Sequence, residues 1–217
     1  MDPSRPTHAV VFVNGDIKDY SSTRRLVQPG DFLVAVDGGL RHLQSLNLVP
    51  GLLIGDLDSV SEEDIAAMQS AGVEIKRYPV EKNETDLELA LLMVAMAGWR
   101  TIRVAGGLGG RLDHTLGNLF LLMLPDLENL DLRLDDGREE VWLVRSQTTL
   151  EGHKGDVVSL LPLNGPASGI ITEGLYYPLQ HDTLYPEHSR GISNVMQGEH
   201  AVISVENGLL LCIHTRG

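Results

Sequence analysis

Short β-rich runs alternate with longer helical patterns through the first two thirds of the 217 residues, and this alternation constrains the fold more than any other feature. Most residues in the runs are aliphatic or β-branched, and Gly, Asp, Asn or Pro follows each run. Such alternation implies right-handed crossovers and a mostly parallel sheet covered by helices on both faces. We expect strands at 9–13, 32–36, 52–54, 74–78 and 101–105, and helices near 21–27, 39–46, 61–70, 86–97 and 112–124.

After about Gln147 the pattern changes, because strand-like runs follow one another without an amphipathic helix between them. The dipeptide Asn207-Gly208 accepts the positive φ angles of a tight turn, so it predicts a hairpin between the strands on either side. This part of the chain is therefore expected to be all-β. Its strand-like runs are 156–162, 169–172, 201–206 and 209–214.

Together these patterns predict an α/β fold with two domains. An N-terminal domain with a doubly wound, mostly parallel sheet is expected at residues 1–147, followed by a smaller C-terminal all-β sandwich domain at 148–217. Two runs near the boundary, 131–134 and 141–144, either extend the first sheet or connect the domains.

The charge balance narrows the choice of ligands. The sequence has 17 basic and 30 acidic side chains, which give a formal net charge of −13. This charge argues against non-specific binding to nucleic acid or an anionic membrane, and a phosphate ligand would need a divalent cation between the two negative partners. The single cysteine, Cys212, excludes an internal disulfide and a cysteine-based zinc site. No signal peptide or membrane span is evident, so we expect a cytoplasmic protein.

Aspartates follow one predicted strand after another, at the end of the sheet where ligands bind in doubly wound folds. An extended backbone between Asp56 and Asp58 would place both carboxylates on one side of the chain. Because clustered like charges repel, we expect a hard cation such as Mg²⁺ among these side chains. Turn formation is the alternative role for each aspartate taken alone. The five carboxylates, from four loops, are Asp37, Asp56, Asp58, Asp86 and Asp113.

A glycine-rich segment, residues 106–110, joins a predicted strand to a predicted helix. Glycines let the backbone approach a polyphosphate closely, and Arg111 beside Asp113 favours a phosphate site over a flexible link. The segment is not a Walker A loop, and Leu112 stands where the dinucleotide fingerprint has its last glycine. Lys82 lies beside a predicted helix start on the same edge, where it is either a phosphate contact or a solvated loop charge.

The second domain carries two adjacent tyrosines, Tyr176 and Tyr177, which point to opposite faces if they lie in a strand. One of them is then exposed. Together with the hydroxyl of Ser193 and the amide of Asn194, an exposed aromatic face would suit recognition of a flat heteroaromatic ring. Ordinary strand packing is the alternative.

Seven short blocks stand in order along the chain: VDGG at 36–39, GDLDS at 55–59, NETDL at 83–87, GGLGGRLDH at 106–114, GD at 155–156, TEGLYYPL at 172–179 and GISN at 191–194. In this order they resemble the thiamine pyrophosphokinase family, over nearly the whole chain from about residue 10. The resemblance implies an α/β nucleotide-binding domain followed by a β-sandwich, in a homodimer with active sites between subunits. It also implies the reaction ATP + thiamine → AMP + thiamine diphosphate, with magnesium, in which catalysis is mainly positioning and charge neutralisation.

The resemblance further implies roles for single residues. Magnesium is assigned to Asp56, Asp58 and Asp86, with Asp37 nearby, and catalysis to the same three together with Asp113. No general base is evident, so we expect one of these carboxylates, or metal coordination of the thiamine hydroxyl, to ease deprotonation. Tyr177 stands where some members carry a tryptophan that stacks on thiamine. The implied ATP-binding residues are Asp37, Gly38, Lys82, Thr85, Gly107, Arg111, Asp113, His114 and Asn118, and the implied thiamine-binding residues are Tyr177, Ser193 and Asn194.

Two other functions use the same sequence features. A magnesium-dependent phosphohydrolase, acting on a nucleotide or a small phosphoester, would take water as the acceptor at the same acidic edge. A non-catalytic nucleotide-sensing module would bind without turnover, but it needs fewer converging carboxylates. No serine or cysteine stands in a nucleophile-elbow pattern, so covalent catalysis has no candidate.

Overall fold

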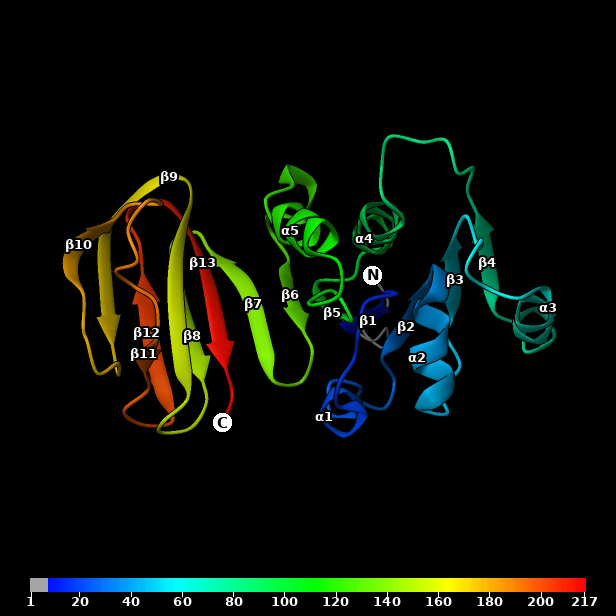
Figure 1. Ribbon diagram of the computed structural model, residues 1–217, viewed down its shortest axis with the longest axis horizontal. Helices are drawn as coiled ribbons and strands as arrows, with labels where there is room; N and C mark the ends of the chain where they lie inside the picture. The colour runs from blue at the N-terminus through cyan, green and yellow to red at the C-terminus, as the bar shows by residue number, and fades with distance from the viewer. Residues whose placement is uncertain (1–7) are drawn as a thin grey trace. The chain divides into compact units, whose positions relative to one another are not determined.

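The computed structural model describes residues 8–217, which form two compact units (Figure 1). The first unit ends at Gly137, and the second runs from Arg138 to Gly217. This division falls earlier in the chain than the boundary predicted at residue 147. The reason is that strand β7 (Glu139–Val144) pairs along its length with β13 (Asn207–Thr215) of the second unit.

The first unit is built on a sheet whose six described strands are all parallel, in the order β4-β3-β2-β1-β5-β6. The chain adds strands outward from β1 to β4 and then returns to the other side of β1 with β5 and β6. The order therefore reverses between β1 and β5, and in such sheets ligands bind beyond the carboxyl ends of the strands at this point. The strands are β1 (His8–Phe12), β2 (Phe32–Val36), β3 (Leu52–Gly55), β4 (Glu74–Arg77), β5 (Thr101–Ala105) and β6 (Asp131–Asp135).

Helices cover both faces of this sheet, as the alternation predicted (Figure 1). Two of the helix starts follow the sequence closely because side-chain caps fix them: the Thr85 hydroxyl accepts from the Glu88 amide at 3.2 Å, and the Ser61 hydroxyl accepts from the Asp64 amide at 3.1 Å. The helices are α1 (Tyr20–Arg24), α2 (Leu40–Ser45), α3 (Glu62–Ser70), α4 (Asp86–Met96) and α5 (Leu112–Leu121), with short 3₁₀ turns η1 (Asp37–Gly39) and η2 (Pro125–Leu127).

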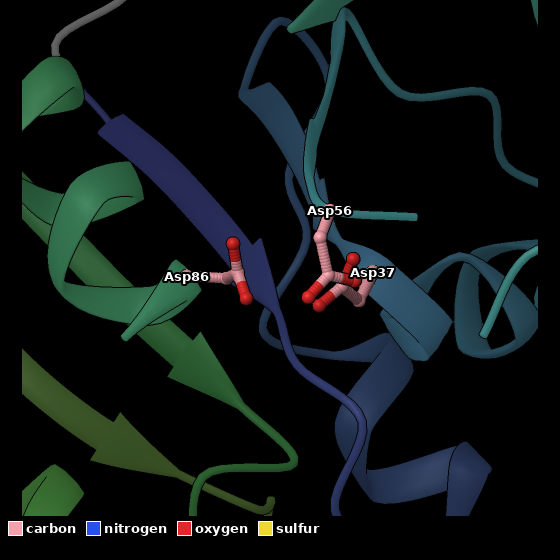
Figure 2. Close-up of side chains that lie close together, drawn as sticks. All are labelled: Asp37, Asp56 and Asp86. Carbon is pink, nitrogen blue, oxygen red and sulfur yellow. The ribbon is translucent and has the colours of Figure 1, made fainter. Parts of the chain in front are cut away.

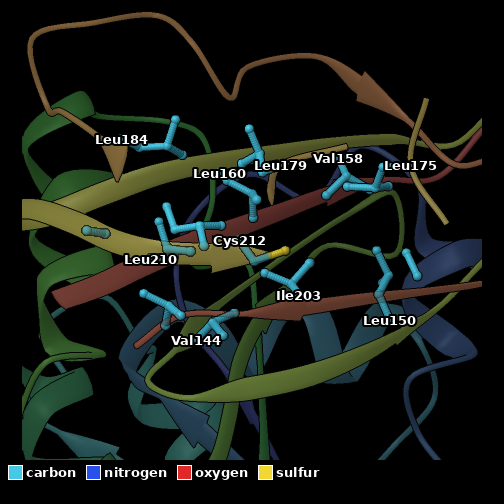
Figure 3. Close-up of a cluster of buried hydrophobic side chains, with 14 of the residues drawn as sticks. Val144, Leu150, Val158, Leu160, Leu175, Leu179, Leu184, Ile203, Leu210 and Cys212 are labelled. Carbon is cyan, nitrogen blue, oxygen red and sulfur yellow. The ribbon is translucent and has the colours of Figure 1, made fainter. Parts of the chain in front are cut away.

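The second unit is an antiparallel β-sandwich organised around one long strand, β9 (Val157–Glu173). Residues 157–168 of β9 pair with β13, and its last residues pair with β12, so a single strand serves both sheets. Leucine, valine and isoleucine side chains from both sheets meet in a core that also contains the fully buried Cys212 (Figure 3). The other strands are β8 (Gln147–Glu151), β10 (Gln180–Leu184), β11 (Asn194–Val195) and β12 (His200–Ser204).

Two local predictions for the second unit are wrong. The runs 156–162 and 169–172 are not separate strands, because β9 continues through Asn164 and Gly165, both with positive φ. The hairpin predicted at Asn207-Gly208 does not form between β12 and β13, since β12 pairs with β8 and β9 while β13 pairs with β7 and β9. In the described part of the chain, no helix has the length and apolar character needed to cross a membrane.

Candidate active site

Three aspartates from separate segments of the first unit converge at one edge of its sheet (Figure 2). Asp37 follows β2, Asp56 follows β3, and Asp86 is the first residue of α4. Each offers a carboxylate oxygen, and these oxygens lie within 4.8 Å of one another. The strand-end argument therefore brings together residues that are up to 49 positions apart in the sequence.

The backbone around these strand ends is shaped to place the Asp37 carboxylate. Asp37 itself has φ 46°, a left-handed value that is uncommon for a residue with a side chain. Its Oδ1 accepts a 2.9 Å hydrogen bond from the Leu57 amide. Gly55 has φ 146°, and a Cβ at this position would overlap the Asp37 carboxylate. Only glycine lets β3 approach the carboxylate this closely.

The three charges are held together at an electrostatic cost. Burial, followed by the nearby charges of Asp86 and Asp56, raises the pKa of Asp37 from 3.8 to about 7. The Oδ1 atom of Asp86 is buried and accepts no hydrogen bond from the described residues. Lys82 Nζ lies 3.1 Å from this oxygen and forms an ion pair, although not a directed hydrogen bond. A bound divalent cation would offset both the repulsion and the unfilled acceptor, and carboxylate oxygens are the ligands that Mg²⁺ prefers.

Asp58 and Asp113 lie outside this group of three. The extended geometry expected between Asp56 and Asp58 is wrong, because Leu57 adopts a left-handed φ of 63°. The Asp58 amide instead donates to Asp56 Oδ1 at 3.0 Å, and the Asp58 side chain is exposed. Asp37, which was expected only to lie near the metal ligands, is instead the third member of the group. The predicted gathering of five carboxylates is thus reduced to three.

A cavity of about 440 Å³ opens where the strand order reverses between β1 and β5. Its walls come from the loop after β1 and from the glycine-rich loop after β5, in which Gly106, Gly109 and Gly110 all have positive φ. Glycines in this conformation allow a close approach of the backbone to a phosphate chain. Side chains lining the cavity are Asn14, Asp16, Arg41, Arg111, His114 and Asn118.

The predicted phosphate-binding residues divide into cavity residues and supporting residues. Arg111 binds Asp113 through two hydrogen bonds, of 3.2 and 2.6 Å, which lower the pKa of the Asp113 carboxyl. Asp113 therefore orients Arg111 rather than joining the acidic group. Asn118 Nδ2 donates to the Gly107 carbonyl at 3.0 Å, so it braces the glycine loop. Thr85 caps α4.

Gly38 has a supporting place beside the acidic group. Its amide donates to the Ser59 hydroxyl at 2.8 Å, which ties the segment after β2 to the segment after β3. A Cβ at Gly38 would approach the Asn14 side chain to within 2.5–2.7 Å, so the loop after β1 leaves no room for a larger residue. The small size of Gly38 therefore lets the segments after β1, β2 and β3 lie close together.

Sequence reasoning missed the loop after β1 and the helix residues that hold it. His42 is buried, its Nε2 lies 2.9 Å from the Gly15 carbonyl, and its Nδ1 lies 2.8 Å from the Tyr20 hydroxyl. Burial lowers the pKa of His42, which favours the neutral ring. Arg41 Nη2 donates to the carbonyls of Asn14 and Gly15 at 3.0 and 3.1 Å. The strand-end argument applied to β1 would have found the loop, but no sequence signal marked Arg41.

In the second unit, hydrogen bonds link two of the three predicted thiamine-binding residues, Tyr177 and Asn194, and the third, Ser193, directly precedes Asn194. The Tyr177 side chain is exposed, and its ring meets that of Tyr176 edge-on with centroids 4.7 Å apart. Ser193 has φ 61°, and its amide donates to the Ser159 hydroxyl at 3.0 Å. Asn194 is buried, and its amide group hydrogen-bonds to the backbone of Tyr177.

Comparison with known proteins decides the family. The family model for the thiamin pyrophosphokinase catalytic domain matches residues 23–134, more than half of the chain, and the model for the thiamin pyrophosphokinase vitamin B1 binding domain matches residues 146–210. The chain belongs to the thiamin pyrophosphokinase family. The resemblance noted from its ordered motifs is confirmed, and the phosphohydrolase and sensing-module alternatives are not favoured.

Individual relatives agree with this assignment. Thiamine pyrophosphokinase of Bacillus subtilis (strain 168) is 27% identical over 184 residues, covering 84% of this chain and 86% of the relative. Thiamine pyrophosphokinase 1 of Arabidopsis thaliana is 26% identical over 180 residues, covering 76% of this chain and 65% of the relative.

Solved structures extend the comparison to the fold. The crystal structure of the Bacillus subtilis enzyme has a TM-score of 0.86 at 23% identity, covering 97% of this chain and 99% of that one. The thiamin pyrophosphokinase from Candida albicans has a TM-score of 0.82 at 16% identity, covering 96% and 88%. The predicted fold class, an α/β unit followed by a β-sandwich, is confirmed.

Proposed function

We propose that this member of the family transfers the pyrophosphoryl group of ATP to the hydroxyl of thiamine, with Mg²⁺ held by Asp37, Asp56 and Asp86. The group of three carboxylates within 4.8 Å carries the proposal. Three observations fit a divalent cation: the clustered carboxylate oxygens, the raised pKa of Asp37, and the Oδ1 of Asp86, which accepts no hydrogen bond from the described residues. When bound, Mg²⁺ neutralises phosphate charge and helps to place the attacked phosphorus.

The chain's own residues would position the two substrates. In the transfer, the thiamine oxygen bonds to the β-phosphorus, the bond from that phosphorus to the α,β-bridging oxygen breaks, and AMP leaves as the hydroxyl proton is released. Arg111, held by Asp113, suits a bidentate contact with phosphate oxygens, and the glycine loop offers backbone amides. His114 lines the same cavity. Lys82, already paired with Asp86, lies where it can balance charge beside the metal.

Thiamine would bind the second unit through the exposed ring of Tyr177, with Ser193 in the neighbouring loop. An exposed tyrosine on a fixed backbone suits stacking on the flat rings of thiamine. We further propose a cytoplasmic homodimer with active sites between subunits, which the family resemblance supports. Sedimentation equilibrium tests the dimer, and a monomer at working enzyme concentrations would contradict it.

A product assay tests the function. Purified protein is incubated with ATP, MgCl₂ and thiamine, and the products are separated. We expect AMP and thiamine diphosphate in equal amounts, and no AMP after chelation of magnesium. Formation of ADP with thiamine monophosphate, or ATP hydrolysis that does not depend on thiamine, would contradict the proposal. Asp56→Asn tests the metal site and should abolish turnover, while Asp58→Asn at the exposed neighbouring position tests the role first assigned to Asp58.

A further inference from the structure

The amide side chain of Asn194 hydrogen-bonds to main-chain atoms of the second unit through both its oxygen and its nitrogen. Its Oδ1 accepts from the amides of Tyr177 and Val195, both at 2.9 Å, and its Nδ2 donates to the Tyr177 carbonyl at 2.7 Å. An N–H on one side and a carbonyl on the other fix which atom is oxygen and which is nitrogen. Asn194 is buried at 8% exposure. A side chain bonded in this way holds the backbone of Tyr177 by both its amide and its carbonyl group.

The hydrogen bonds from the Asn194 side chain to the backbone of Tyr177 form a clamp, and this clamp is anchored in the sandwich. Asn194 and Val195 form β11, whose partners on the long strand β9 are Val158 and Val157. The Val195 carbonyl accepts from the Tyr176 amide at 2.9 Å. Asn194 therefore extends a regular ladder by one residue, binding both polar groups of Tyr177 as a neighbouring strand would. The result is a fixed backbone beneath the exposed tyrosine ring.

Tyr177, whose backbone Asn194 holds, is the residue expected to contact thiamine. Tyr177 is 65% exposed, so packing from the core does not hold its ring in place. Its only ring contact within the described aromatic residues is the edge-on approach of Tyr176. Holding the backbone of an exposed aromatic residue reduces the entropy lost when a ligand stacks on it. Buried hydrogen-bonded side chains of this kind position a binding residue from behind.

We propose that Asn194 is a positioning residue for thiamine binding, which acts through Tyr177 and does not itself contact the substrate. The inference rests on the proposed function and changes the role that the sequence motif implied for Asn194. Removing the clamp should weaken thiamine binding without altering the ATP site, because every clamp contact lies within the second unit.

Steady-state kinetics with a double-mutant cycle tests the proposal. For Asn194→Ala we expect the KM for thiamine to rise about tenfold, or about 1.4 kcal/mol, while the KM for ATP and kcat change less than about threefold. Tyr177→Ala should raise the same KM at least as much. The double variant should match Tyr177→Ala alone, because a clamp has no effect without the ring it positions. Additive effects would show an independent contact with thiamine and overturn the proposal, as would an unchanged KM in Asn194→Ala.

A second variant and a ligand-free measurement guard against misfolding. Asn194→Asp keeps the size and the acceptor but places an oxygen against the Tyr177 carbonyl, so it should raise the thiamine KM in the same direction. Near-ultraviolet circular dichroism of the free protein reports the coupled Tyr176–Tyr177 pair. Asn194→Ala keeps all five tyrosines and should still change this signal, whereas Tyr185→Ala, at another exposed tyrosine, shows the change that comes from losing one ring outside the pair. An unchanged signal in Asn194→Ala overturns the clamp. Absence of AMP and thiamine diphosphate in the native assay defeats the proposed function, and the dichroism result still decides the clamp.

Discussion

Replacing Asp37 with asparagine removes one charge from the acidic group while keeping the shape of the side chain. The asparagine Oδ1 can still accept the hydrogen bond from the Leu57 amide, so the local backbone should be retained. Without metal, burial and the charges of Asp86 and Asp56 raise the pKa of Asp37 from 3.8 to about 7. That difference is equivalent to about 4 kcal/mol. Because Asp37 is only partly buried, solvent screening reduces the expected effect on stability to about 1–2 kcal/mol.

The folded and unfolded chains bind the Asp37 proton with different affinities, and this sets the direction of the effect. Below pH 3.8 the carboxyl is protonated in both states, and its full contribution to stability is present. Between pH 3.8 and about 7 the unfolded chain releases the proton more readily, so the free energy of unfolding falls as the pH rises. Once the pH is well above 7, Asp37 is ionised in both states and its contribution to the free energy of unfolding is lost completely. Asp37→Asn has no such loss, so at pH 8 without metal it should be the more stable protein by about 1–2 kcal/mol.

Urea unfolding at pH 4 and pH 8, with chelator or with magnesium, measures this difference. Magnesium should stabilise the native protein at pH 8, because a ligand that binds only the folded state raises its stability. The same addition should have little effect on Asp37→Asn, which has lost a ligand. Asp58→Asn is the matched control outside the acidic group, and we expect its stability to change by less than about 0.5 kcal/mol. The reasoning is refuted if Asp37→Asn is less stable than the native protein at pH 8 in chelator, or responds equally to magnesium.

Three further substitutions test other parts of the site. Asp86→Asn should lower the rate of AMP formation more than about 100-fold, since a metal ligand matters at least as much as the groups that orient it, and a rate within a few fold of native would contradict its role. Gly55→Ala should abolish stabilisation by magnesium, whereas Gly72→Ala, where φ is 78° and the space is open, should cost stability but keep the magnesium response in thermal unfolding. Arg111→Lys should raise the KM for ATP about tenfold because lysine cannot form two parallel hydrogen bonds to phosphate; an unchanged KM would remove Arg111 from the nucleotide site.

Features encoded within a few neighbouring residues were predicted well. The start of α4 at Asp86 was predicted correctly because Thr85 supplies its own cap, and the parallel sheet followed from the alternation of strands and helices. The convergence of Asp37, Asp56 and Asp86 also followed, since neighbouring parallel strands end at one edge. Local propensity and strand direction were sufficient for these features.

Features that depend on long-range pairing or on one unusual dihedral were not predicted. Asn207-Gly208 has the composition of a hairpin turn, but β12 and β13 each pair with β9, with partners 29 to 58 residues earlier in the chain. Pairing of this kind is decided by packing across the sandwich rather than by the turn. Likewise, no property of a leucine indicates that Leu57 will adopt φ 63°. That single angle separates Asp58 from Asp56.

The same unusual dihedrals show where the fold departs from what stability alone would favour. Among the described residues, six other than glycine have positive φ, and Asp37, Leu57 and Ser193 are three of them. Each such residue costs about 1–3 kcal/mol, and the acidic group adds repulsion between carboxylates. A sheet that needed only a turn after β2 and β3 would carry glycine or asparagine there without a second partly buried carboxylate. Strain and repulsion therefore occur at the same two strand ends, and a cation bound by the oxygens that they bring together would remove the repulsion and offset the strain.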